Sequence, residues 1–291
     1  MSSRKTRALL GWAYLLPYAT LFVLFVLVPI VVAAYLAVMQ FDLTSPRSAG
    51  FVGFRNFVDA WKDEYLQRAF VVTAKFAAMM VPSLVVTAFA LALGLNAMPR
   101  GRNTVRALVF LPTMFTVAVT GILWQWFYNL EFGLFNFILR NLGLAPVPWL
   151  SDKNIAMPSI VLMSLWWTSG GTAVILLAGL QNIPRMFHEA AALDGADGWR
   201  GFWSVTFPLL RPVVLFVVVT NLIGAFQFFP QAQLLTGGGP ELATRGVVQY
   251  IYETAFNGYR LGYAAAMSWM LAAVVAVFGF LQFWLMRKEA S

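Results

Sequence analysis

The side chains with the clearest capacity for chemistry gather in a short polar segment, EAAALDGADG at residues 189–198. The segment carries three carboxylates, Glu189, Asp194 and Asp197, and it follows the only histidine of the chain, His188. Catalysis or metal binding would need several such groups held together, and one histidine with scattered acids does not provide them. We therefore predict no catalytic residue and no metal site, and the role of this segment depends on the elements that hold it.

Those elements are strongly apolar. The chain has 291 residues, of which 60% are hydrophobic and only 11% charged. Six stretches of at least 24 residues contain no Asp, Glu, Lys or Arg, whereas the next longest has 11. About 20 apolar residues in a helix cross a bilayer core, and a soluble helical bundle would need polar helix faces that these stretches lack.

The pattern predicts an all-α integral membrane protein with six transmembrane helices, because backbone groups in lipid must be satisfied within each span. We expect one transmembrane domain over residues 10–290, after a cytoplasmic N-terminal segment at 1–9. The expected helices lie at about 10–39, 70–95, 107–128, 156–180, 212–229 and 263–286.

The net charge of +8 is distributed unevenly between the loops. With a cytoplasmic N-terminus, the cytoplasmic segments hold 11 basic and 4 acidic residues, and the opposite side holds 9 and 8. This is the positive-inside asymmetry of a membrane protein, and it removes nucleic acid as the reason for the charge. The first apolar stretch is too long for the core of a signal peptide, so we predict a retained helix and two cytoplasmic termini.

The polar segment lies in a predicted cytoplasmic loop at 181–210. Asn182 can cap a helix that has Pro184 in its first turn and covers residues 183–193. The three alanines in that helix favour helical structure and permit close approach of another element. Asp194 and Gly195 predict a stop and a turn, since glycine tolerates positive φ.

A second short helix is predicted after Asp197, which can cap it. The prolines Pro208 and Pro212 are expected to separate it from the next membrane helix. One apolar face of this helix carries aromatic residues at positions i, i+3 and i+4: Trp199, Phe202 and Trp203. Such a face is typical of contact with a partner, or of packing on the bilayer surface or against the protein's own helix ends.

The segment EAAALDGADGWRGFWSVTFPLLRP (189–212) resembles the EAA loop of permeases in binding-protein-dependent ABC importers. The matching positions are Glu189, Ala190, Ala191, Asp194, Gly195, Ala196, Phe202, Pro208 and Pro212. One position departs, because Phe207 stands where leucine is usual. Residues 51–61 and 234–271 are similar to the carbohydrate branch of that family.

The resemblance implies the type I ABC importer permease fold and a role for the loop as the coupling helix that docks in a cleft on an ATPase subunit. Glu189 would pair with a basic group there, Gly195 would form the turn, and Trp199, Phe202 and Trp203 would fill the cleft. The implied partners are a second homologous permease, two ATPase subunits that hold ATP and Mg, and an extracytoplasmic substrate-binding protein. The implied place is the cytoplasmic (inner) membrane of a bacterium or archaeon.

The chain is not expected to hydrolyse ATP or to bind a cofactor. No lysine follows a glycine, so the phosphate-binding pattern G-x-x-x-x-G-K-[ST] is absent from the sequence. The segment GGGP at 237–240 is expected to form a turn. Lys75, near one end of the second predicted helix, is expected to extend its ammonium group toward the membrane surface.

The solute predicted from the resemblance is a sugar or a related polyol or glycerol phosphate. Aromatic and amide side chains within the spans are candidates for its path, since sugar sites use flat rings and hydrogen-bonding amides. The candidates are Trp124, Trp166, Asn221, Gln227 and Gln231. Packing explains the same residues, because amides also join helices in lipid.

The alternative function is a stand-alone secondary transporter. Proton or sodium coupling would require acids within the membrane. No Asp or Glu lies inside the six charge-free stretches, so the sequence favours the importer subunit.

Overall fold

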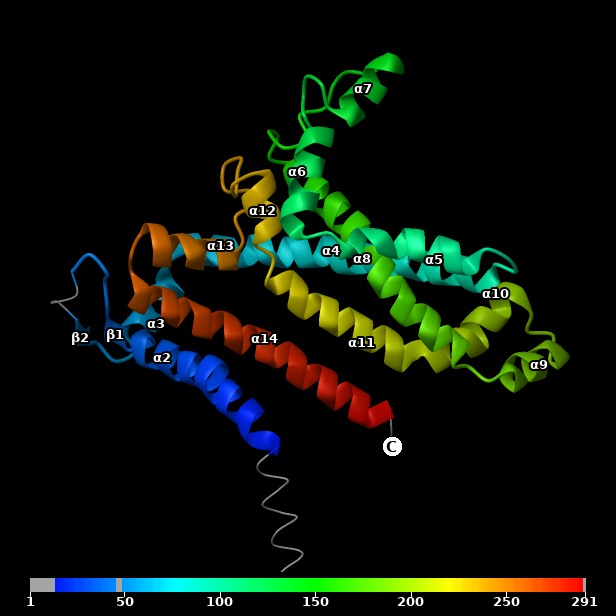
Figure 1. Ribbon diagram of the computed structural model, residues 1–291, viewed down its shortest axis with the longest axis horizontal. Coiled ribbons are helices and arrows are strands. Elements are labelled where there is room, and N and C mark those ends of the chain that lie inside the picture. The colour runs from blue at the N-terminus through cyan, green and yellow to red at the C-terminus, as the bar shows by residue number, and fades with distance from the viewer. Residues whose placement is uncertain (1–13, 46–48, 290–291) are drawn as a thin grey trace, which may run out of the picture. The chain divides into compact units, whose positions relative to one another are not determined.

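The structure of the protein is a computed structural model that describes residues 14–45 and 49–289 (Figure 1). Its regular elements are helices except for one pair of two-residue strands, which confirms the predicted all-α class. The α-helices from α2 to α8 are α2 (Val28–Ala37), α3 (Arg55–Lys62), α4 (Glu64–Ala97), α5 (Arg102–Phe110), α6 (Val117–Phe127), α7 (Leu134–Asn141) and α8 (Ala156–Gln181). Those that follow are α9 (Arg185–Leu193), α10 (Gly198–Gly201), α11 (Phe207–Phe226), α12 (Pro230–Leu235), α13 (Val247–Tyr252) and α14 (Leu261–Glu289).

Five continuous helices in the described ranges are long and apolar enough to cross a membrane, and one bent pair would make a sixth. The five are Tyr14–Ala37, Glu64–Ala97, Ala156–Gln181, Gly198–Phe226 and Leu261–Trp284. Helix α4 begins six residues before the predicted start at residue 70. The predicted N-terminal segment at 1–9 and the first residues of the predicted first helix lie outside the described residues.

The third predicted helix, at 107–128, is wrong as a continuous element. Two helical segments, Arg102–Met114 and Val117–Phe127, replace it, and the angle between them is 96°. A 3₁₀ turn containing Pro112 ends the first half, since proline lacks the N–H that an α-helix would use. Thr116 is extended and its hydroxyl accepts a hydrogen bond from the N–H of Val119 at 3.4 Å, which starts a new helix.

The chain divides into two compact units. The first comprises the chain up to Glu64 with Ile251–Ala272, and the second comprises Tyr65–Tyr250 with the chain from Ala273 onward. In the first unit, strand β1 (Met39–Gln40) pairs antiparallel with β2 (Gly50–Phe51). The Asn56 side-chain amide donates to the carbonyl oxygens of Ala37 and Met39, both at 2.9 Å, and so satisfies backbone acceptors where the first long helix ends.

The second unit is built on a core shared by α4, α8 and α11. Its α4 surface includes Ala88 and Ala92, which are fully buried and one helical turn apart. Small residues at this spacing let neighbouring helices approach closely, which is how helices pack in lipid. The larger buried residues opposite them include Leu176 on α8 and Leu210 on α11. This core supports the polar segment, because α8 leads into α9 and α10 leads into α11 (Figure 1).

Candidate functional site

Helix α9 carries the first half of the predicted coupling loop and lies almost entirely at the surface. Leu193 is 90% exposed and Met186 is 67% exposed. At 100° per residue, Met186, Glu189, Ala190 and Leu193 share one face of the helix. The opposite face carries Ala191, the one buried residue of α9. The exposed face is therefore an apolar surface with one carboxylate in it, and we call it the outer face of α9.

The turn after α9 is a Schellman motif formed by the three residues Asp194, Gly195 and Ala196. Gly195 has φ = 71°, in the left-handed region that favours glycine. Its N–H donates to the carbonyl oxygen of Ala192 at 3.1 Å, and the N–H of Ala196 donates to that of Ala191 at 2.8 Å. This is the bonding pattern that closes helices with a glycine after the cap. The predicted turn thus lies where the sequence placed it.

The second half of the loop presents an aromatic cluster. Asp197 lies at the N-cap position of α10 with an extended backbone, although its side chain makes no capping hydrogen bond. Trp199 and Phe202 stack with ring centroids 5.4 Å apart, and Trp203 meets both edge-on at 5.7 and 5.2 Å. Phe202 also meets Phe89 of α4 at 5.6 Å, so it packs within the protein. Trp199 and Trp203 remain 72% and 51% exposed.

Two predictions about the ends of the loop are wrong. Asn182 is the C-cap residue of α8, and α9 begins after Pro184 instead. Pro208 and Pro212 do not separate the second short helix from the next membrane helix, since Gly198–Phe226 is continuous. A π-helical turn at Phe202–Thr206 precedes Pro208, which lies in the first turn of α11. The wider turn accommodates a proline that cannot donate a backbone hydrogen bond.

A cavity of about 560 Å³ lies between part of the loop and the ends of the membrane helices behind it. Its walls on the loop side include His188, Asp197 and Phe202, and its opposite wall includes Leu93 and Asn96 of α4. The histidine therefore lies on the inner side of α9, away from the outer face. Among the described residues no three His, Asp or Glu side chains are grouped closely enough to hold a metal ion.

The first two substrate-path candidates belong to an aromatic cluster in the second unit. Trp124 is only 4% exposed and contacts Tyr128, Phe135 and Trp166, with ring centroids 5.3 to 5.8 Å apart. Its indole N–H has no hydrogen-bond partner among the described residues. This environment supports packing for Trp124, while Trp166 is 37% exposed.

The three amide candidates do not gather in one place on one helix. Asn221 donates to the carbonyl oxygen of Val217 at 2.8 Å, one turn back on α11. Gln227 is exposed at the C-cap of α11, and Gln231 lies on the separate helix α12. The side-chain oxygen of Gln231 is buried and has no partner within the described chain.

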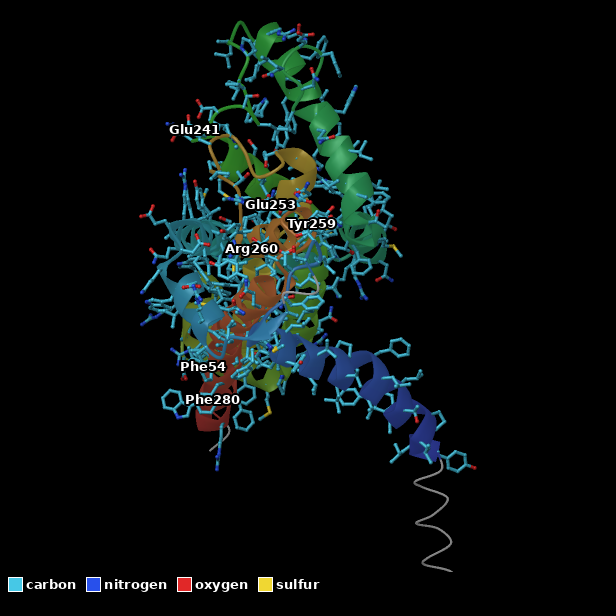
Figure 2. The ribbon with its side chains drawn as sticks, turned by 90° about the vertical axis from the view of Figure 1, so that its left-hand side faces the viewer. Phe54, Glu241, Glu253, Tyr259, Arg260 and Phe280 are labelled. Carbon is cyan, nitrogen blue, oxygen red and sulfur yellow. The ribbon has the colours of Figure 1, made fainter. Side chains whose placement is uncertain are left out.

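Sequence reasoning missed other features of the second unit. The outer face of α9 could have been found from the seven-residue spacing of Met186 and Leu193 in a helix bounded by polar turns. Gln249 on α13 is fully buried and donates to Gln233 at 3.0 Å, but nothing in its apolar sequence context marks it. Glu241, labelled in Figure 2, accepts from Lys153 at 3.1 Å, a contact between residues 88 positions apart.

Comparison with known proteins shows that nearly the whole chain is similar to the members of one protein family. The family described as "Binding-protein-dependent transport system inner membrane component" matches residues 8–288. The trehalose/maltose transport system permease protein MalF of Thermococcus litoralis is 35% identical over 255 residues, which cover 88% of this chain and 85% of that protein. The sn-glycerol-3-phosphate transport system permease protein UgpA of Agrobacterium fabrum is 34% identical over 282 residues, which cover 97% and 96%.

A third relative is the sulfoquinovosyl glycerol transport system permease protein SmoG of Agrobacterium fabrum, 31% identical over 266 residues that cover 91% of this chain and 86% of that protein. Among solved structures, a bacterial ABC transporter that imports the acidic polysaccharide alginate contains a chain with TM-score 0.87 and 23% identity, covering 99% of both chains. That likeness establishes the fold. The extent of the family match and the identity of these relatives together show that the chain belongs to the inner membrane components of binding-protein-dependent transport systems, the permease subunits of ABC importers.

Proposed function

We propose that this chain forms, with a second permease of its family, the membrane path of an importer for a sugar or a related polyol or glycerol phosphate. The names of the relatives support the solute class, since trehalose, maltose, sulfoquinovosyl glycerol and sn-glycerol-3-phosphate are all small and rich in hydroxyl groups. An extracytoplasmic binding protein would deliver the solute. Two ATPase subunits would bind ATP and Mg, and both termini of this chain would lie in the cytoplasm.

The coupling contact is assigned to the predicted EAA loop, and the observation that carries this assignment is the outer face of α9. Exposed apolar surface of this kind is typical of a contact with another protein or with the membrane, and we assign this one to the ATPase subunit. Glu189 lies within it, and a carboxylate there would select a partner cleft that has a basic group. Trp199 on α10 and Trp203 in the π-helical turn after it would extend the same contact, since their rings are exposed and held by the aromatic cluster.

The connections of the loop support a mechanical role. A movement imposed on α9 reaches α10 through the three-residue Schellman turn, and α10 is continuous with the membrane helix that ends at Phe226. Helix α8 enters the loop from the other side, and Leu210 of α11 packs with Leu176 and Leu177 of α8 in one core. ATP-driven closure of the ATPase pair would therefore shift two membrane helices together.

Reconstitution of the importer with a Glu189→Ala variant tests the proposal. We expect the variant complex to insert normally and to lose solute uptake along with the stimulation of ATP hydrolysis by the loaded binding protein. Glu131→Ala is the matched control, because Glu131 is also exposed but lies in the segment before α7, outside the loop. Normal uptake by Glu189→Ala, Gly195→Pro and the control alike would refute the coupling assignment.

The subunit composition is tested by purification of the chain from its native membranes in mild detergent, followed by mass spectrometry. We expect a second permease and an ATPase in stoichiometric amounts. Recovery of this chain alone, with solute transport in liposomes that needs no ATP, would instead establish a secondary transporter.

A further inference from the structure

A groove between α5 and α8, outside the coupling loop, has the chemistry of a binding site. It is open to the surface, has a volume of about 370 Å³ and is lined by Asn103, Arg106, Ala107, Phe110 and Val174. The four α5 residues follow the spacing i, i+3, i+4 and i+7, so they occupy one face of the helix. The polar pair lies at the start of α5 and the apolar pair follows, with Phe110 about 6 Å beyond Arg106 along the helix axis.

Arg106 is the charged group of this groove, and it has no partner among residues 14–45 and 49–289. Its side chain is exposed and its guanidinium makes no hydrogen bond and no ion pair there, and beside it the groove is lined by one amide, Asn103, and three apolar residues. Arg102, one turn earlier, differs: it donates to the carbonyl oxygens of Asn96 and Met98 at 2.8 and 3.3 Å and so closes the end of α4. A guanidinium without a carboxylate suits an anion with several acceptor oxygens, above all a phosphate.

The walls of the groove are held together by backbone contact. A Cβ atom added to Gly170 of α8 would lie 2.0 Å from the carbonyl oxygen of Val109, so α5 and α8 touch without an intervening side chain. The positions of Arg106 and Phe110 relative to Val174 are therefore set by helix packing, which makes the groove a preformed site.

We infer that this groove binds the head group of an anionic phospholipid. Arg106 and the Asn103 amide would take the phosphate, and Ala107, Phe110 and Val174 would contact the glycerol backbone and the first acyl carbons. A free phosphate ester would use the polar half alone, whereas a lipid uses both halves and reaches the groove through the membrane. Basic pockets between helices on the cytoplasmic side are typical sites for such head groups. The placement on that side rests on the orientation proposed above.

The test measures lipid binding directly, so its outcome is independent of the coupling assignment. The purified importer would be titrated with dioleoylphosphatidylglycerol or dioleoylphosphatidylcholine and bound lipid would be counted by native mass spectrometry. We expect Arg106→Gln to weaken phosphatidylglycerol binding about tenfold, the size expected for a lost charge-assisted hydrogen bond. Arg106→Lys keeps the charge but loses the planar guanidinium group. Its affinity for phosphatidylglycerol should lie between that of Arg106→Gln and that of the unmodified chain. Arg100→Gln is the control, because Arg100 is an exposed arginine of the same turn that does not line the groove.

A second measurement separates a lipid from a solute phosphate. Phe110→Ala should weaken binding of the dioleoyl lipid, because the ring would contact its glycerol backbone and first acyl carbons, and should leave binding of inorganic phosphate at Arg106 unchanged. Displacement of the lipid by sn-glycerol-3-phosphate at equal concentration would overturn the inference in favour of a solute site. Equal binding of phosphatidylglycerol and phosphatidylcholine, or no change in Arg106→Gln, would overturn it altogether.

Discussion

The N–H of Ala196 donates to the carbonyl oxygen of Ala191 at 2.8 Å, and Ala191 is also the one buried residue of α9. The same alanine therefore anchors the helix to the protein and fixes the direction in which the chain leaves it. Two sequence features of the predicted EAA loop, the paired alanines and the D-G-A that follows, form one structural unit. The outer face of α9 takes its orientation from this unit.

Gly195 is expected to tolerate replacement in the order Asn, Ala, Pro. Asparagine adopts positive φ readily, alanine costs about 1–2 kcal/mol there, and proline cannot reach φ = 71° at all. Uptake coupled to ATP hydrolysis in proteoliposomes should fall in the same order. Gly94→Ala is the control, since a Cβ atom at Gly94 meets nothing within 4 Å and alanine favours a helix. Equal activity of the Asn, Ala and Pro variants would show that the turn does not set the coupling geometry.

The exposed leucine and methionine of α9 should contribute to assembly without contributing to folding. Leu193→Ser and Met186→Ser are expected to change the free energy of unfolding by less than about 0.5 kcal/mol, as is usual for exposed positions. Each should weaken the association with the ATPase subunits about tenfold, because side chains central to an interface carry much of its binding energy. Thermal unfolding and ATPase retention on an affinity resin measure the two effects.

Ala192→Ser provides the matched control for these variants, since Ala192 is exposed on α9 but lies off the outer face. ATPase retention that is unchanged for Leu193→Ser, or reduced equally for Ala192→Ser, would place the contact elsewhere on the loop.

The sequence predicted the fold class and the centre of the loop because both depend on local signals. Charge-free stretches mark membrane helices, and the glycine after α9 marks a backbone that needs positive φ. The order of elements around Glu189 and Gly195 followed from propensities that tertiary packing did not override.

The bend at Thr116 and the continuity across Pro208 could not be predicted in the same way. An apolar stretch gives the same composition whether the helix within it is straight or bent by 96°. Proline usually marks a helix boundary, because it lacks the backbone N–H that the helix needs. A π-helical turn next to the proline allows the helix to continue, and no residue pattern specifies that turn. The burial of Trp124 likewise depends on rings from other helices, Phe135 on α7 and Trp166 on α8.

Pro208 is expected to maintain the angular relationship between the aromatic cluster and α11. The N–H of Phe207 donates to the carbonyl oxygen of Phe202 across the π-helical turn, and Pro208 cannot donate to the carbonyl of the turn before it. In Pro208→Ala a regular α-helix becomes possible, which would rotate Trp199 and Trp203 by about 100° relative to the membrane helix. Spin-label distances between α10 and α4 should change, and uptake per ATP hydrolysed should fall. Unchanged distances would mean that neighbouring helices, and not the proline, maintain the turn.

Trp124 is expected to contribute to the stability of the fold and not directly to solute binding. It is buried within the aromatic cluster, and replacement of such a side chain by alanine costs about 3–5 kcal/mol through lost contacts and a cavity. Trp124→Ala should therefore lower the unfolding temperature markedly, whereas Trp126→Ala, at an exposed position on the same helix, should leave it nearly unchanged. Trp124→Phe keeps much of the packing and should retain both stability and the apparent affinity for solute. A Trp124→Phe protein of normal stability with a strongly raised KM for uptake would instead assign the indole to the solute path, since only a direct contact with the solute would change KM while the fold stays intact.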